Sequence, residues 1–447
     1  MKHKITLTLL LLANILLAQD EQKKHSLTLQ QAIEHALKNN YSAINATKDI
    51  QAAKEKKWET TASGLPQING NIGYLNNLDF TEQGVTGGGG FGGAPGTVST
   101  ITFGTKHSVD ARATLSQLLF DGSYLVGLQS AKVYLQISEN AKIKTDFQIK
   151  EMVTNAYGNV LLARENISIL EKNKTSLEKT YFDTNETFKN GLIEEENVEQ
   201  LQITLSQLKS TLSNATRRSD IALQMLKIAL GIDISEELIL TEKLDDLTTN
   251  NIDLTILAED FNVNENIDYK ISQNNEDSKR LLLKYERSKA LPTLAANLNY
   301  GYNSFENKFD FLNQNQKWYN YSNFGVSLNV PIFSSFAYGA KKQQAKIAYE
   351  QATTKLKETE QNLKLQFQSV KNDYEFSIEQ LATSKSNLKL AERIENKQQI
   401  KFKEGLSSSF EFTEAQRQLY SAQQNYLQSM IDVITKKTAL DKITNNK

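Results

Sequence analysis

Leu65-Pro66-Gln67-Ile68 returns 226 positions later as Leu291-Pro292-Thr293-Leu294. A second motif, Phe188-Lys189-Asn190-Gly191-Leu192, returns 214 positions later as Phe402-Lys403-Glu404-Gly405-Leu406. The two spacings differ by 12, so the two halves of the chain share one order of elements and differ in the length of one connection. Self-similarity of this kind predicts two copies of one structural unit.

Each Leu-Pro pair marks a change of hydrophobic period. The residues before it have helical character, from about 27 to 61 in the first copy and from about 266 to 289 in the second. Proline disfavours helix at the residue that precedes it, so both helices should end there. Pro66 and Pro292 are therefore predicted to be helix-to-strand corners.

Alternation with a period of two follows each corner. Apolar side chains such as Ile68 and Ile72 alternate with polar ones such as Asn69 and Asn71. Strands that are apolar on one face suit a membrane barrel around a watery lumen, but a half-buried sheet of a soluble protein has the same period. Both alternatives stay open at this point. Four such strands are predicted, at residues 67–74, 109–116, 294–302 and 323–330.

One polar segment separates the two strands of each pair. Residues 81–105 are rich in glycine, and residues 303–320 are rich in Asn, Gln and aromatic side chains. Neither composition is suited to building a core, so both segments are predicted to be exposed loops. Candidates for an aromatic girdle at a membrane interface are Tyr74, Tyr300, Tyr302, Trp318, Tyr319 and Tyr321.

Two long segments predict long helices. Residues 122–187 and 336–401 each run for 66 positions without a proline, which corresponds to about 100 Å of continuous helix. Parts of both segments have coiled-coil spacing, with small and polar residues in the seam. The return segments 193–230 and 264–289 are shorter, and their summed length suggests that they stack end to end beside one long helix.

The repeat and the helices together define the expected domain organisation. Residues 19–240 form the first structural repeat, residues 241–263 an equatorial connector and residues 264–447 the second repeat. The expected order in each repeat is helix, strand, loop, strand, long helix and return helix. The predicted fold class is therefore mixed α and β with an internal duplication.

The N-terminus has the pattern of a secretory signal. Lys2 and Lys4 precede an apolar run that ends at Ala18, so residues 1–18 are predicted to be a signal peptide. The run is too short to cross a bilayer as a helix, although a non-cleaved anchor is the alternative. No later apolar stretch approaches the ~20 residues of a membrane helix. Any membrane insertion of the mature chain must therefore use strands.

Composition excludes several function classes. The chain has no cysteine, which removes disulfides, thiolate metal sites and a cysteine nucleophile. Its four histidines are not clustered at metal-ligand spacing, so no metal or other cofactor is expected. Without the signal peptide, 49 Lys and Arg balance 52 Asp and Glu, which argues against nucleic acid as a partner. No catalytic constellation stands out, and the chain is not expected to be an enzyme.

In its repeated order of corners, strands and turns, the chain resembles the TolC-like outer-membrane factor family. The resemblance covers nearly all of the mature chain and includes the strand-to-helix segments at 119–122 and 331–334. It implies a homotrimer in which four transmembrane strands from each chain close one 12-stranded β-barrel, continuous with a long α-helical coiled-coil tunnel in the periplasm. Closure is also physically required, because open strand edges are not tolerated in lipid.

The resemblance further implies a function and partners. The protein would be the exit duct of a tripartite efflux or type I secretion system in the outer membrane, working with a periplasmic adaptor protein and an inner-membrane pump. Its cargo, whether drug, metal or protein, stays open. A trimeric coiled-coil surface adhesin or structural envelope protein is the alternative, since it would also be exported and free of cysteine.

By the same resemblance, the two Gly-Leu turns form the periplasmic tips. Gly191 and Leu192 in the first copy, with Gly405 and Leu406 in the second, are the candidate adaptor-docking residues. Glycine also suits any turn that ends a helix, so a purely structural role is the alternative.

Glu411 and Glu414 follow the second turn at the positions where family members ring the constriction with carboxylates. Six glutamates from three chains would form a cation-binding ring, although glutamates on an exposed helix are commonly only solvated. Phe402 and Ser407 occupy positions at which some relatives have a tyrosine and an arginine that tie the tip closed. That particular lock cannot form in this chain.

Overall fold

The computed structural model describes residues 24–87, 94, 96–258, 260–313 and 315–445. The predicted signal peptide lies outside these residues. Two compact units are present: a helical unit of residues 1–50, 137–273 and 355–447, and a strand unit of residues 51–136 and 274–354.

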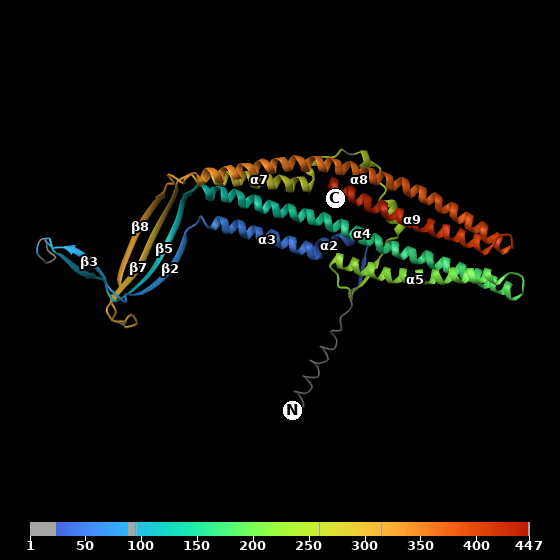
Figure 1. Ribbon diagram of the computed structural model, residues 1–447, viewed down its shortest axis with the longest axis horizontal. Helices are drawn as coiled ribbons and strands as arrows, with labels where there is room; N and C mark the ends of the chain where they lie inside the picture. The colour runs from blue at the N-terminus through green and yellow to red at the C-terminus, as the bar shows by residue number, and fades with distance from the viewer. Residues whose placement is uncertain (1–23, 88–93, 95, 259, 314, 446–447) are drawn as a thin grey trace, which may run out of the picture. The chain divides into compact units, whose positions relative to one another are not determined.

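The strand unit is built on one four-stranded antiparallel sheet of order β2-β5-β7-β8 (Figure 1). Its strands are β2 Gln67–Asn76, β5 His107–Asp121, β7 Thr293–Glu306 and β8 Tyr319–Asn329. All four strands were expected from the alternation, and their existence is confirmed. β5 and β7 continue beyond the predicted ends because their backbone ladder runs from the pair His107–Glu306 to the pair Asp121–Thr293.

The two segments expected to be loops contain more structure than predicted. Within 81–105, β3 Thr81–Thr86 pairs with β4 Val98–Phe103 as an antiparallel hairpin. The alternating Val, Ser, Thr and Ile residues of β4 favour strand, a signal outweighed in the sequence by the neighbouring glycines. In the second segment Phe311 is buried and contacts Phe309 and Tyr74 edge to face. The expectation that neither segment could pack was therefore wrong in part.

Two long helices and two return helices form hairpins in the helical unit. The long helices are α4 Gly122–Lys189 and α8 Ala337–Lys403, and the return helices are α5 Glu195–Leu230 and α9 Ser409–Thr444 (Figure 1). The predicted long helices are thus confirmed to within a few residues. The helices bury a row of apolar side chains between them, among them Tyr157, Leu177, Leu201 and Phe412, each fully buried.

A break at Asn40 divides the helix predicted at 27–61 into α2 Leu29–Asn39 and α3 Tyr41–Ala62. The Asn40 side chain accepts a hydrogen bond from the backbone N–H of Ser42 and donates one to the carbonyl oxygen of Ala229, both at 2.8 Å. Ala229 lies in the last turn of α5, whose carbonyl groups have no partner within the helix. The Asn40 side chain thus ties the end of α5 to the start of α3.

Asn266 makes the equivalent connection in the second half. It accepts from the N–H of Asp268 at the start of α7 Ile267–Ser288 and donates to the carbonyl of Ile443 in the last turn of α9. The prediction that 193–230 and 264–289 stack on each other therefore chose the wrong partners. The α5 end meets α3, and the α9 end meets α7, because the pairing depends on tertiary contacts that segment lengths do not specify.

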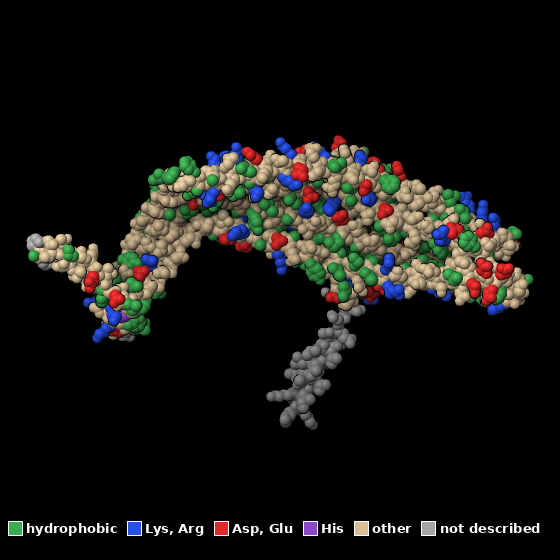
Figure 2. Space-filling model, viewed as in Figure 1, with side chains coloured by type: hydrophobic (Ala, Val, Ile, Leu, Met, Phe, Trp, Pro, Cys, Tyr) green, Lys and Arg blue, Asp and Glu red, His purple; other side chains and the backbone are tan. Residues whose placement is uncertain are grey.

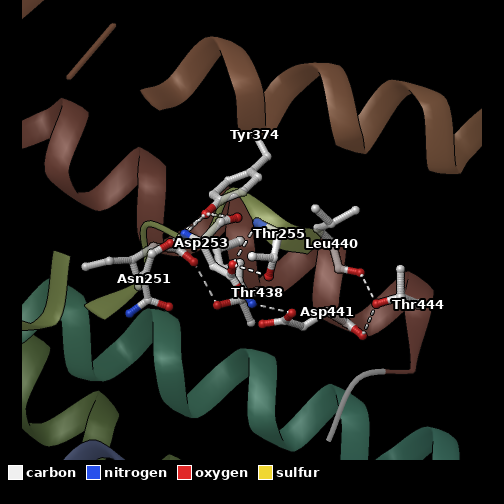
Figure 3. Close-up of polar contacts among 10 residues, drawn as sticks. Asn251, Asp253, Thr255, Tyr374, Thr438, Leu440, Asp441 and Thr444 are labelled. Atoms are coloured by element: carbon white, nitrogen blue, oxygen red, sulfur yellow. Dashed lines mark hydrogen bonds and ion pairs between the residues drawn. The ribbon is translucent and has the colours of Figure 1, made fainter. Parts of the chain in front are cut away.

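The described residues of the connector pack within the helical unit. It follows β6 Glu237–Leu240, which pairs in parallel with β1 Lys24–Leu27, and contains α6 Leu244–Asn250, η1 Thr255–Ala258 and η2 Val263–Glu265. The phenol of Tyr374, fully buried on α8, donates to the carbonyl of Asn251 at 2.7 Å and accepts from the N–H of Asp253 at 2.8 Å (Figure 3). Tyr374 thus ties the connector to α8, as does the stack of Phe261 on Phe367 of the same helix.

Candidate functional site

The turn between α4 and α5 begins where glycine allows the helix to end. Gly191 has a φ of 74°, and its N–H bonds to the carbonyl of Phe188 while that of Leu192 bonds to Thr187. This hydrogen-bond pattern closes a helix C-terminus and requires a left-handed residue, which glycine adopts without strain. The Leu192 side chain is left 75% exposed.

The turn between α8 and α9 has the same geometry. Gly405 has a φ of 71°, its N–H bonds to Phe402, and that of Leu406 bonds to Lys401. Leu406 is 77% exposed. The four residues predicted at the tips therefore occupy two matched turns, each with one exposed leucine.

The structure brings the two turns together around one groove. A space of ≈ 730 Å³ lies between them, lined by α4 residues such as Thr184 and by Leu192, Asn197, Leu406 and Glu411. The Asn197 side-chain oxygen accepts a hydrogen bond at 3.3 Å from the N–H of Ser409 in the other hairpin. Figure 2 shows acidic side chains over the α4–α5 turn, where α5 begins with acidic residues.

Glu411 is held by the first turn of α9. Ser408 and Glu411 form a capping box, in which the Ser408 hydroxyl accepts from the Glu411 N–H and the Glu411 carboxylate accepts from the Ser408 N–H at 3.0 Å. The Ser407 hydroxyl also donates to this carboxylate, at 2.8 Å. These bonds, the one from the Ser408 N–H foremost, lower the pKa of Glu411.

Glu414 has a different partner. Arg417, one helical turn further along α9, donates two hydrogen bonds to its carboxylate at 2.8 and 2.9 Å. These bonds lower the pKa of Glu414. Arg417 was missed in the sequence, although its spacing of three residues from Glu414 is the usual spacing of a helical ion pair.

The residues at the positions of the missing lock make other contacts. Phe402 stacks on the buried Phe412 with ring centroids 5.3 Å apart and an interplanar angle of 8°. Ser407 donates to Glu411. Both contacts tie α8 or the turn to α9 within one chain, so the tip is organised by an aromatic stack and a cap.

A buried polar group further from the tip was not anticipated. Glu395 on α8 lies beside Gln416 on α9, and burial raises the pKa of its carboxyl group while the bond from Gln416 partly offsets this. Burial, with the nearby charge of Glu395, raises the pKa of Tyr420 to about 12. The Oε1 atom of Gln416 is buried without a partner. Only the packing of α8 on α9 places these residues together, so a local sequence motif could not reveal them.

The Leu-Pro corners lie where they were predicted. α3 ends at Ala62 and β2 begins directly after Pro66, while α7 ends at Ser288 and β7 begins directly after Pro292. The Gln67 side chain closes the first corner by donating to the carbonyl of Ala62. Helix passes to strand at both prolines.

One face of the sheet is an exposed apolar surface. Ile72 is 81% exposed, and register pairs it through Ala111 and Tyr302 with residues on the same face. Further exposed side chains of this face are Ile68, Tyr74, Leu298, Tyr300, Phe324, Val326 and Leu328. Exposing an apolar surface of this size to water is unfavourable. We therefore expect lipid or another protein to cover it.

Among the described residues, no helix combines the length and the apolar character needed to cross a membrane. Among the same residues, no group of His, Asp or Glu side chains is arranged to hold a metal ion.

Comparisons with known proteins agree on one family and fold. Residues 272–446 match the family model described as outer membrane efflux protein. The chain is 22% identical to outer membrane protein TolC of Vibrio cholerae serotype O1 over 408 residues, covering 91% of this chain and 88% of the relative.

Solved structures share the fold over nearly the whole chain. VceC, an outer membrane protein of Vibrio cholerae, superposes with a TM-score of 0.70 at 14% identity, covering 93% of this chain and 95% of the other. The CmeC outer membrane channel of Campylobacter jejuni gives a TM-score of 0.71 at 18% identity, with coverages of 93% and 85%.

Proposed function

This chain is a TolC-like outer membrane efflux protein, and from that premise we propose that it forms the exit duct of a tripartite efflux or type I secretion system. It resides in the outer membrane and extends into the periplasm. The family and the relatives are channels rather than enzymes. The observation that carries the proposal is a sheet that exposes a full apolar face and is followed at both strand pairs by long helices.

The duct is proposed to be a homotrimer. Among the described strands, β2 pairs only with β5 and β8 only with β7, so the sheet of one chain has two free edges. Free edges are not tolerated in lipid, and three copies would close them into one 12-stranded barrel. Two repeats of one unit, each supplying two strands and one helical hairpin, would give the trimer its near sixfold wall.

Exposed apolar stripes on the helices support the same assembly. On α5, Ile221, Met225 and Ile228 are more than half exposed and recur at helical spacing. On α8, Phe376 is 60% exposed and Leu390 is 43% exposed. Neighbouring protomers would cover these stripes as coiled-coil seams. A surface adhesin would explain the stripes but not the apolar sheet face.

The two Gly-Leu turns and the apolar strand face are proposed to contact different partners. The groove between Leu192 and Leu406, with Gly191 and Gly405 shaping the turns, is proposed to receive the periplasmic adaptor that links the duct to an inner-membrane pump. Glu411 and Glu414 are proposed to ring the constriction. The apolar strand face is proposed to contact outer-membrane lipid, with Pro66 and Pro292 at its inner surface.

Cysteine labelling tests the barrel directly, because the chain has no cysteine of its own. Asn69 and Ile72 lie on opposite faces of β2. In proteoliposomes, Asn69→Cys should react with a water-soluble thiol reagent through the lumen, while Ile72→Cys should be shielded by lipid. Equal reaction at both positions would contradict the proposed barrel.

A further inference from the structure

The polar face of the sheet is nearly free of charge. It is formed mostly by Asn, Gln, Ser, Thr, Gly and a few aromatic residues of the four strands, with Leu75 and Ala295 among them. Within the described strands its charged residues are Asp110 and Arg112, neighbours on that face of β5, and Asp121, which ends β5 and caps α4. The Asp110–Arg112 pair is partly exposed, and an exposed ion pair contributes little to stability by itself.

Three strands hold this pair in place. Tyr321 on β8 donates its hydroxyl to Asp110 at 2.7 Å, and the Nε atom of Arg112 lies 3.6 Å from the same carboxylate. Register aligns Arg112 with Gly301 on β7 and Gly301 with Tyr321. Asp110 is thus fixed from two sides, and it anchors the guanidinium.

Gly301 makes the arrangement possible. A Cβ atom at this position would lie 2.9 Å from the Cβ of Arg112 and 2.9 Å from the ring of Tyr321, closer than side chains approach. Without a side chain at Gly301, the arginine and the tyrosine can lean toward each other over the β7 backbone. The Cβ would also lie 2.8 Å from the backbone oxygen of Ala111, so the close approach of both neighbouring strands requires glycine here.

Of the two charged side chains, Arg112 is more exposed than Asp110. The Arg112 side chain is 49% exposed against 33% for Asp110. The guanidinium has five N–H donors, more than one carboxylate and one phenol can engage. A solute that passes this face would therefore meet unengaged guanidinium donors.

We propose that Arg112 is a charge filter on the lumen wall, which attracts the carboxylate, sulfonate or phosphate groups of passing solutes and repels cations. Asp110 and Tyr321 are positioning residues that hold the guanidinium over Gly301. The inference rests on the proposed barrel, in which this face lines the lumen. Three copies would place three guanidinium groups at one level, nearer the loop end of β5 than its helix end.

A cysteine at Asn71 reports the local potential. Asn71 on β2 is the register partner of Arg112 on the same face, so the two side chains are about 5 Å apart at Cβ. The measurement is the ratio of the reaction rates of Asn71→Cys with an anionic and a cationic methanethiosulfonate. This ratio is independent of where the duct limits conductance.

In about 0.1 M salt, adding Arg112→Gln should lower the anion-to-cation rate ratio at least about threefold, and Asp110→Asn should raise it, given charges this close. Both effects should largely vanish in 1 M salt, where the Debye length is about 3 Å. Tyr321→Phe leaves the charge unchanged but removes the hydrogen bond that positions Asp110, so it should still lower the ratio. If Tyr321 only stabilised the fold, the ratio would not change while the trimer stayed intact. A ratio unchanged by Arg112→Gln overturns the filter.

Two further reporters separate this inference from the proposed barrel. Gln67→Cys lies on the same face but is paired with Ser116, further along β5, and its rate ratio should not respond to Arg112→Gln. Ile72→Cys lies on the apolar face and should stay unreactive. Equal reaction at Asn71→Cys and Ile72→Cys would refute the barrel itself. Selective reaction at Asn71→Cys with no Arg112 effect would refute only the filter.

Discussion

At the scale of single residues, Glu395 couples the packing of α8 on α9 to pH. The folded protein raises the pKa of its carboxyl group by burial. The folded state therefore holds this proton more tightly than the unfolded chain does. The stability that protonated Glu395 contributes is lost as pH rises through the raised pKa.

Glu395→Gln should remove this dependence. We expect the variant to melt at a higher temperature than the parent at pH 8, by about 2–4 °C for each kcal/mol regained, and at a similar temperature at pH 5. Thermal melts followed by circular dichroism in detergent measure this. Glu392→Gln, at an exposed position on the same helix, is the control. It should not change the difference between the melting temperatures at pH 5 and pH 8.

Glu411 and Glu414 allow a second test at this scale. Each carboxylate has partners within its own chain that lower its pKa, so both are charged at neutral pH. Replacement of Glu411 by alanine would also remove the bond of the capping box that its carboxylate accepts from the Ser408 N–H, which contributes about 1 kcal/mol. Glutamine at both positions removes the charge and keeps the capping box.

The Glu411→Gln, Glu414→Gln double variant should lose block by divalent and trivalent cations added from the tip side of a planar bilayer. Trimer formation should be unaffected. If block persists unchanged, the glutamates are ordinary surface charges. A triple glutamine variant of Glu194, Glu195 and Glu196 then tests the other turn as the constriction.

At the scale of elements, the matched turns depend on backbone conformation rather than on space. A Cβ at Gly191 or Gly405 would meet nothing within 4 Å, but both residues have positive φ. Alanine there should cost about 1 kcal/mol and speed local hydrogen exchange of the turn about fivefold. Gly339→Ala, within α8 and equally uncrowded, should cause no such increase, because alanine favours helix. Similar exchange in all three variants would contradict this account.

The end-to-end helix stacks are elements of a second kind. Asn40→Ala and Asn266→Ala should each cost about 1–3 kcal/mol, since a buried carbonyl of α5 or α9 loses its donor. Hydrogen exchange should rise at the start of α3 or α7 respectively. Asn39→Ala is the matched control, because Asn39 is exposed and bonds only within its own helix. An effect of Asn39→Ala as large as that of Asn40→Ala would refute the stacking role.

At the scale of the whole molecule, the proposed trimer needs its helical seams covered. Purified protein should have the mass of three chains and a circular dichroism spectrum dominated by helix. Met225→Lys places a charge in the exposed apolar stripe of α5 and should shift the mass, measured by light scattering in mild detergent, toward monomer. A wild-type monomer with protected strands would contradict the shared barrel.

The sequence by itself determined the elements. Proline at 66 and 292, period-two alternation after them and glycine at 191 and 405 specify corners, strands and turns, because each acts on the backbone of its own neighbourhood. The β3–β4 hairpin was missed because glycines around it obscured a weak strand signal.

Only the tertiary structure decided which elements meet. The stacking of α5 on α3, the stack of Phe402 on Phe412 and the cluster of Arg112, Gly301 and Tyr321 join residues far apart in the chain. Such contacts depend on packing and register, and these are set by all the elements together. A local sequence pattern therefore does not specify which distant element packs against it.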